Sequence, residues 1–205
     1  MDPLDFLDTQ ATYLGFTYDQ IELYGAILAI AVMTFTLIRF IFRKKRERWR
    51  VRYSRKWLKN FRKNASKYSR GQQLEYIQKI EHFVFEEILL SCFEERGYRI
   101  QRTRYTNDGG VDGTTFLNGN RVIIQAKRYS VPIGKQDVRK FIKLVNHGFR
   151  RKRGLFIHTS TASKPIRALV RAEDRIEFIC PENHLFDLLY GNEFSVMNIP
   201  IRAAK

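Results

Sequence analysis

A carboxylate, a side-chain amide and an ammonium group fall within one short stretch of the chain that predicts a β-hairpin. The dipeptide Asn118-Gly119 separates two stretches suited to strands, and Asn-Gly favours the two-residue type I′ turn. With that turn the register places Asp112 directly across from Gln125. Facing side chains point to the same side of a sheet, so we expect these two to converge.

Lys127 joins this pair because side chains alternate along a strand. Gln125 and Lys127 share one face, and the register sets Lys127 diagonal to Asp112 and opposite Gly110, which has no side chain to crowd it. Mg²⁺ prefers oxygen ligands and takes one or two carboxylates together with water and phosphate oxygens. A nearby lysine can orient or deprotonate water, or neutralise a phosphate. The three side chains therefore have the composition of a divalent-metal site beside a phosphate.

The sequence around these residues resembles the catalytic core of Mrr-like restriction endonucleases, a family of the PD-(D/E)xK nuclease superfamily. The resemblance rests on Asn107-Asp108-Gly109-Gly110-Val111-Asp112 and on Gln125-Ala126-Lys127-Arg128-Tyr129 after the hairpin. Weaker matches are Phe85-Glu86, Val138-Arg139, and the stretch from Gly154 through Thr159-Ser160, so that the resemblance covers about residues 74–190. It implies metal-dependent hydrolysis of DNA phosphodiester bonds.

The resemblance also implies a role for each matching residue, with Mg²⁺ or Mn²⁺ as the cofactor. Asp112 is the main metal ligand, and Gln125 offers its side-chain oxygen or orients the water. Lys127 activates the nucleophile or stabilises the charged pentavalent state. Glu86 completes the acidic cluster from the preceding helix, with Glu87 as its rival. Gln is frequent at the position of Gln125 in the family, so it does not imply an inactive enzyme, although it contributes no negative charge.

Four further residues are candidates for contact with DNA. Arg128 and Tyr129 follow the second strand of the hairpin, where they either reach a phosphate or simply end the strand. Lys135 and Arg139, together with Lys143, recur along a predicted helix, where they are either solvated charges or a row facing phosphates.

The elements that must position these residues follow from periodicity and turn signals. Apolar residues at helical spacing predict a helix over residues 74–96 that ends at Gly97. A strand or its approach over 98–105 and the glycine-rich turn NDGGVDG lead to the hairpin. The remaining expected elements alternate between helix and strand: hairpin strands 114–117 and 120–128, helix 136–147, strand 154–158, a helix after Ser163, strand 176–180 and helix 181–190. This order predicts an α/β protein with a mixed sheet flanked by helices.

Charge divides the 205 residues into three zones. The net charge of +16 makes an acidic partner such as nucleic acid or anionic lipid the expectation. Residues 1–42 carry one Arg and five acids, a net of −4, and residues 43–70 carry 14 Lys and Arg against Glu47, a net of +13. The remaining residues carry +7.

Two cysteines, Cys92 and Cys180, exclude a disulfide scaffold and a zinc ribbon.

The first zone contains a candidate transmembrane helix. Ile21–Phe42 carries no charge except Glu22 and Arg39. At about 1.5 Å per residue its 22 residues span roughly 33 Å, close to the hydrocarbon core of a bilayer. A signal peptide would begin basic and end at small residues, whereas this segment begins acidic and ends in Arg-Lys-Lys-Arg. Lys and Arg are confined to the flank after the helix, which predicts an outside N-terminus and a cytoplasmic remainder.

The basic segment carries four aromatic residues at spacing four, Trp49, Tyr53, Trp57 and Phe61. That spacing predicts one helical face. A juxtamembrane helix on anionic lipid is one interpretation. A nucleic-acid-binding arm with interleaved basic and aromatic residues is the other, and the position beside the membrane favours lipid.

Together these features predict a restriction-endonuclease-like mixed sheet preceded by one transmembrane helix. We expect an extracytoplasmic N-terminus (1–20), a transmembrane helix (21–42), a basic juxtamembrane segment (43–70) and an Mrr-like nuclease domain (71–205). The expected function is a DNA endonuclease, anchored in the inner membrane, that acts in restriction or defence against foreign DNA. The alternatives are a membrane-tethered DNA-binding module without catalysis and a repair or junction-resolving nuclease. The expected partners are DNA, lipids through residues 21–70, and a second copy of the chain.

Overall fold

The computed structural model describes residues 18–103, 110–146 and 152–204. The chain divides into two compact units, residues 1–49 and residues 50–205. The helices are α2 (Tyr18–Asn64), the 3₁₀ turn η1 (Ala65–Lys67), α3 (Arg70–Gln78), α4 (His82–Glu95), α5 (Lys135–Asn146), α6 (Lys164–Arg171) and α7 (Leu185–Tyr190). The strands are β1 (Gln101–Arg102), β2 (Gly113–Leu117), β3 (Asn120–Lys127), β4 (Lys152–His158), β5 (Ile176–Ile179), β6 (Phe194–Val196) and β7 (Ile199–Ile201).

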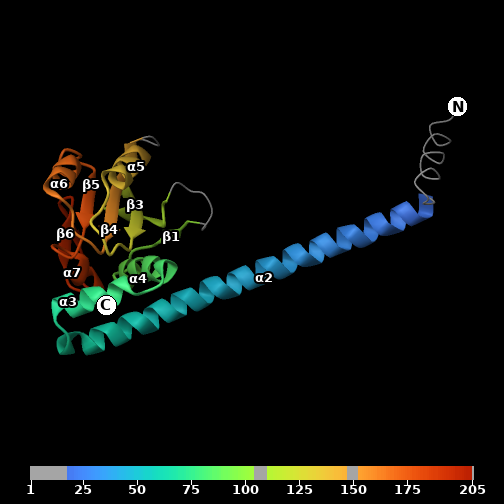
Figure 1. The fold of residues 1–205 in the computed structure, drawn as a ribbon, viewed down its shortest axis with the longest axis horizontal. Helices are drawn as coiled ribbons and strands as arrows, with labels where there is room; N and C mark the ends of the chain where they lie inside the picture. Colours follow the sequence, from blue (N-terminus) through green and yellow to red (C-terminus); the bar gives the residue numbers. More distant parts are fainter. Residues whose placement is uncertain (1–17, 104–109, 147–151, 205) are drawn as a thin grey trace. The chain divides into compact units, whose positions relative to one another are not determined.

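The five strands β1 to β5 form one mixed sheet in sequence order (Figure 1). Pairs β1–β2 and β2–β3 are antiparallel, and pairs β3–β4 and β4–β5 are parallel. Helices α4 and α7 contribute to the core cluster on one face, and α5 and α6 contribute to the core cluster on the other. The predicted α/β class, with a mixed sheet flanked by helices, is confirmed.

The β2–β3 hairpin has the predicted register. Leu117 pairs with Asn120 and Gly113 pairs with Ile124. Asn118 has φ 47° and Gly119 has φ 74°, which are the two positive values that a type I′ turn needs. The Asn-Gly signal therefore fixed which residues of β2 and β3 face each other.

The predicted helix 74–96 is two helices. α3 ends at Gln78 and α4 begins at His82, because Glu81 acts as an N-cap whose carboxylate accepts the N–H of Val84 at 3.1 Å. The start of α3 is fixed by a capping box in which the Ser69 hydroxyl and the Gln72 amide each bind the other's backbone.

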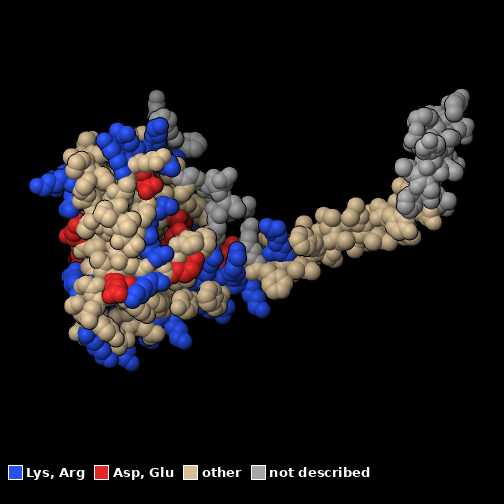
Figure 2. All heavy atoms as spheres, in the orientation of Figure 1, with Lys and Arg blue, Asp and Glu red and all other residues tan. Residues whose placement is uncertain are grey.

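The first part of α2 is exposed and apolar. Among the residues that the structure describes, one helix is long and apolar enough to cross a membrane, and none of its apolar window is buried. Figure 2 shows this stretch as a mainly uncharged surface, with Lys and Arg gathered in the turns that follow.

The last turns of α2 belong to the folded unit rather than to a separate segment. Trp57 is 8% exposed, and Leu58 and Phe61 lie with it in the core cluster that also holds residues of α4 and α7. The Arg62 guanidinium donates to the carbonyl of Leu189 at 2.7 Å. The folded unit therefore starts at Arg50, before the boundary at residue 71 that charge suggested.

The predicted lipid-facing row of aromatic residues is wrong for Trp57 and Phe61, whose side chains are buried, while Trp49 and Tyr53 are exposed. A step of four residues turns an α-helix by about 400°, or about 40° more than a full turn. The row therefore drifts around α2, and only its later members reach the core.

The C-terminal hairpin was not predicted. β6 and β7 pair antiparallel across Met197 and Asn198, both of which have positive φ. The alternation in Phe194–Val196 and the Asn before Ile199 are its sequence signals, but each strand is only three residues long.

Candidate active site

Asp112 lies where the β2–β3 ladder departs from its regular register. Its backbone N–H donates to the carbonyl of Ile124 at 3.0 Å, although Ile124 already pairs with Gly113. This is the hydrogen bonding of a β-bulge, which re-aims a side chain. Asp112 Oδ2 accepts the N–H of Ala126 at 2.6 Å, so the side chain replaces a backbone acceptor and the carboxylate is held against β3.

The bulge changes which residue faces Gly110. The regular ladder predicted Lys127 there, but a Cβ on Gly110 would overlap the Nε2 atom of Gln125. Gly110 has φ 88°, a conformation that favours glycine. Gly110 therefore makes room for the buried Gln125 amide, and the prediction that it makes room for Lys127 is wrong.

Neighbouring glutamates on α4 have different surroundings. Glu87 is 2% exposed and accepts two hydrogen bonds from Arg102 Nε, at 2.9 and 3.0 Å. Arg102 also pairs with Glu94 at 2.6 Å. Glu86 is half-buried, makes no such pair with Arg102, and lines together with Glu87 and Asp112 a small cavity of about 30 Å³, which is large enough for a water molecule. The geometry therefore favours Glu86 over Glu87 as the α4 carboxylate of the site.

The electrostatics of the site disfavour two ionised carboxylates without a cation. Burial, reinforced by the charge of Asp112, raises the pKa of Glu86 to about 8. Burial raises the pKa of Asp112 to about 6, against the opposing effects of the Ala126 N–H and the charge of Lys127. The charge of Arg50 also favours ionised Glu86. Arg50 was not singled out in the sequence, where it is one of 14 cations in the basic segment.

These residues fit a divalent cation. Within the described ranges no group of three or more His, Cys, Asp and Glu side chains gathers to hold a metal. Two carboxylates suit an ion that keeps several water ligands, as Mg²⁺ does. A cation beside Glu86 and Asp112 would lower both raised pKa values.

The comparisons with known proteins concern the family of the chain rather than single residues. The sequence profile of the Mrr catalytic domain, described as a restriction endonuclease, matches residues 77–189, which is more than half of the chain. The chain belongs to the Mrr restriction endonuclease family. The family implies a DNA endonuclease, which is a hydrolase, and its PD-(D/E)xK chemistry generally uses divalent metals. A search of curated proteins found no match.

Several solved structures are similar to the Mrr-like domain. One is the MspJI restriction endonuclease in complex with a 27-mer oligonucleotide, with 19% identity, a TM-score of 0.41, and coverage of 59% of this chain and 29% of that one. A second is restriction endonuclease FokI, with 15% identity, a TM-score of 0.44, and coverage of 58% and 26%. A third is a repair endonuclease from Pyrococcus abyssi, with 20% identity, a TM-score of 0.33, and coverage of 41% and 39%. The chain thus spans under two fifths of these proteins.

Two candidate DNA contacts of the Mrr-like domain make internal contacts. Arg128 Nη1 donates to the carbonyl of Gln78. The Tyr129 hydroxyl donates to Asp137 at 2.7 Å, and the Thr159 hydroxyl donates to the Tyr129 carbonyl at 2.8 Å. Burial and the hydrogen bond of the hydroxyl to Asp137 raise the pKa of Tyr129. The structure therefore favours the alternative in which both residues fix the end of β3.

The α5 candidates lie on an exposed face. Lys135, Arg139 and Lys143 are exposed, while Val138, Phe141 and Val145 of the same helix are buried. Asn107, Asp108 and Gly109, which belong to the family motif, lie outside the described residues.

Arg102 was missed in the sequence. It holds Glu87 and Glu94 of α4 from strand β1, which ties the helix carrying Glu86 to the sheet. Arg102 lies within residues 98–105, which were expected to form a strand or its approach, but nothing local indicated which carboxylates it would meet.

Proposed function

We propose that the chain is a metal-dependent DNA endonuclease that acts in restriction or defence against foreign DNA. The observation that carries the proposal is the meeting of Glu86 and Asp112, both with raised pKa values, under the electrostatic influence of Lys127. A pair of buried carboxylates beside a lysine is costly to fold and suits a site that receives a cation and a phosphate. The family match supports the same reaction.

Each residue of the site has its own role in the proposed hydrolysis. A divalent ion, when bound, supplies positive charge that stabilises the attacking and leaving oxygens of an in-line displacement. Asp112 and Glu86 would hold it, and Gln125 would offer an oxygen to the ion or to a water. Lys127 orients the attacking water and neutralises the phosphate. A bond forms from the water oxygen to phosphorus as that water gives up a proton to the solvent. The bond to the leaving sugar oxygen breaks, and the leaving oxygen takes up a proton from the solvent.

We also propose that the nuclease is anchored in the inner membrane through the apolar part of α2. The helix has the length and polarity of a single span, and the basic flank after it supports a cytoplasmic nuclease domain. Residues 1–20 would be extracytoplasmic, residues 21–42 the span, and the cations from residue 43 onward would lie near anionic lipid. A homodimer stays a prediction from sequence.

A cleavage assay tests the proposed activity. We expect the intact protein in detergent to cut plasmid DNA with Mg²⁺ or Mn²⁺ and not in EDTA, and Lys127→Ala to lose this cleavage while remaining folded. Lys164→Ala, which changes an exposed lysine on α6, should cut as the parent does. Lys127→Ala cutting at the parental rate would overturn the assigned mechanism.

The fragment used for such assays matters. Fragment 50–205 keeps Trp57, Leu58 and Phe61, and we expect it to fold and to cut DNA. Fragment 71–205 removes these core side chains, and loss of buried aromatic residues costs about 3–5 kcal/mol each. We expect it to unfold or aggregate, as measured by circular dichroism and size-exclusion chromatography.

A further inference from the structure

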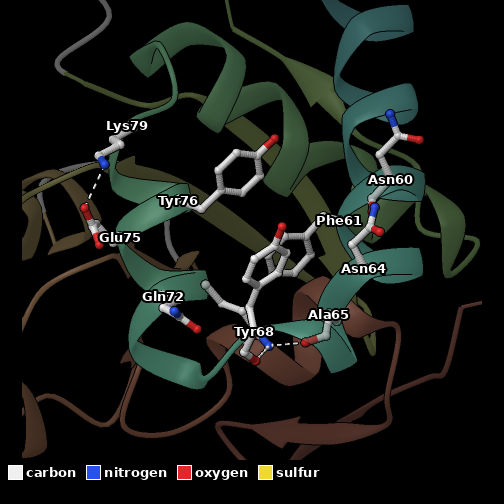
Figure 3. A pocket seen from close by; sticks show the side chains of 10 residues that line it. Asn60, Phe61, Asn64, Ala65, Tyr68, Gln72, Glu75, Tyr76 and Lys79 are labelled. Atoms are coloured by element: carbon white, nitrogen blue, oxygen red, sulfur yellow. Dashed lines mark hydrogen bonds and ion pairs between the residues drawn. The ribbon is translucent and has the colours of Figure 1, made fainter.

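A cleft lies between the last turns of α2 and helix α3. Its volume is about 370 Å³, within the range of small-molecule sites. Figure 3 shows Asn60 and Asn64 on the α2 side, Gln72 and Tyr76 on the α3 side, and the Tyr68 ring between them. None of its lining residues belongs to the candidate active site.

The aromatic residues of the cleft are held by a stack of rings. Trp57 stacks on Phe61 with centroids 5.0 Å apart and on Tyr76 with centroids 5.4 Å apart, both within 13° of parallel. Phe61 is buried, whereas Tyr68 and Tyr76 are 55% and 53% exposed. The cleft therefore presents two aromatic rings to solvent, one of them fixed by the stack, and a planar ligand can stack on such rings.

Two side-chain amides at the cleft, those of Asn64 and Gln72, each have one of their two polar atoms in a hydrogen bond. Asn64 Nδ2 donates to the carbonyl of Asn60 at 2.9 Å, and Gln72 Oε1 accepts the N–H of Ser69 at 2.9 Å. Among the described residues, no hydrogen bond occupies Oδ1 of Asn64 or Nε2 of Gln72. The two hydrogen bonds orient the amides. Oδ1 of Asn64 then offers an acceptor and Nε2 of Gln72 offers a donor, which matches the hydrogen-bonding edge of a nucleobase.

Two exposed lysines of α2 neighbour a residue that lines the cleft. Lys56 lies four residues before Asn60 and Lys63 lies three residues after it, so both are its neighbours on the helix surface. Both lysines are exposed. The acid that lines the cleft, Glu75, is paired with Lys79 at 2.7 Å. An anionic group attached to a planar ligand would thus meet uncompensated positive charge.

We propose that this cleft binds a nucleotide, with the base on Tyr68 and Tyr76 and the phosphate at Lys56 and Lys63. A lipid headgroup would use the lysines but not the rings, which is why the observations favour a nucleotide. The source is either an unstacked nucleotide of a DNA strand or a free nucleotide. The DNA source rests on the proposed nuclease function, since it makes the cleft a second contact for the substrate.

Binding measured without metal tests this site separately from cleavage. The intact protein in detergent with EDTA is titrated against a fluorescein-labelled single-stranded oligodeoxynucleotide of about 20 nucleotides. We expect Tyr68→Ala and Tyr76→Ala each to weaken binding about tenfold, and Tyr76→Phe to bind as the parent does. Phe116→Ala, which removes another exposed ring, on β2, is the matched control. Lys63→Gln should lower the slope of log K against log salt by about 0.7, and Lys164→Gln should not.

Competition with deoxynucleoside monophosphates distinguishes the two sources. Displacement of the oligonucleotide from the parent, lost in Tyr68→Ala, assigns the cleft to free nucleotides, and absence of displacement assigns it to a DNA strand. Parental binding by both tyrosine variants, or equal weakening by Phe116→Ala, would overturn the proposal. The proposal would also be overturned if the tyrosine variants kept parental DNA binding but lost binding to anionic vesicles. Cleavage is scored in a separate assay with Mg²⁺, so a failed nuclease proposal is recognised there and leaves the binding result of the cleft unaffected.

Discussion

Glu86 and Glu87 are adjacent on α4 but occupy opposite electrostatic environments. Glu87 is buried and compensated by Arg102. Glu86 faces Asp112, and its pKa is raised to about 8 by burial and by that carboxylate. A compensated buried charge holds a fold together, whereas carboxylates that repel each other mark a place for a cation. Within one helical turn, the difference separates a structural residue from the carboxylate that we propose for the active site.

The largest effect on stability should come from changing Glu87, the glutamate whose charge Arg102 compensates. Glu87→Gln leaves Arg102 with Glu94 alone, and removing one partner of a buried pair costs about 3–5 kcal/mol. Urea denaturation should show this loss, while Glu75→Gln, which opens an exposed pair with Lys79, should change stability by less than about 0.5 kcal/mol. Equal effects would show that Arg102 does not anchor α4.

Glu86→Gln should lower cleavage and leave folding stability intact, the reverse of the effect expected for Glu87→Gln. We expect cleavage to fall at least about a hundredfold, equivalent to about 2.7 kcal/mol, with no loss of folding stability because the amide removes an unfavourable charge. Single-turnover cleavage at saturating Mg²⁺ measures the first effect and urea denaturation the second. A fully active Glu86→Gln protein would return the role to Glu87 or to no α4 carboxylate.

The pH dependence of stability sharpens the comparison. Glu86 and Asp112 have pKa values of about 8 and about 6 in the folded protein, above ordinary values, so their ionised forms are disfavoured by folding. The contribution of these two groups to metal-free stability should be fully present below about pH 4 and should be lost as the pH rises through their folded-state pKa values toward 9. Glu86→Gln should flatten this decline, and Mg²⁺ should stabilise the parent more at pH 9 than at pH 6. An identical decline in parent and variant would exclude Glu86 as its source.

The smallest effects should come from charges distant from this pair. Replacing Lys135, Arg139 or Lys143 of α5 with Gln should reduce the salt slope of duplex binding by about 0.9 for each residue that contacts a phosphate. Each change should leave single-turnover cleavage at saturating enzyme unaltered. Unchanged slopes for all three would show that the α5 face is merely solvated.

Local signals were enough to predict the hairpin and much of the candidate site. The Asn118-Gly119 turn fixed the register of β2 and β3, and with it the approach of Asp112 to β3. The bulge at Asp112 was not predictable, because it depends on a side-chain hydrogen bond to Ala126. The register alone therefore set the wrong residue against Gly110.

Long-range contacts account for the other differences. Composition placed residues 43–70 outside the folded domain, but Trp57 and Phe61 bury against α3 and α7. A run of charged residues indicates which part of the chain is exposed to solvent. It does not reveal the apolar residues within the run that become buried when a partner helix packs against them. Similarly, Arg102 and Glu87 lie 15 residues apart, and only the fold brings them together.

Cleavage of supercoiled plasmid by Asp112→Asn tests the central claim most directly, because Asp112 is the carboxylate shared by the cavity, the bulge and the family motif. The intact parent should nick or linearise the plasmid with Mg²⁺ and not in EDTA. Asp112→Asn, with a parental circular dichroism spectrum and parental DNA affinity in EDTA, should leave the plasmid supercoiled. Parental cleavage by Asp112→Asn, or equal cleavage by the parent in EDTA, would contradict the account.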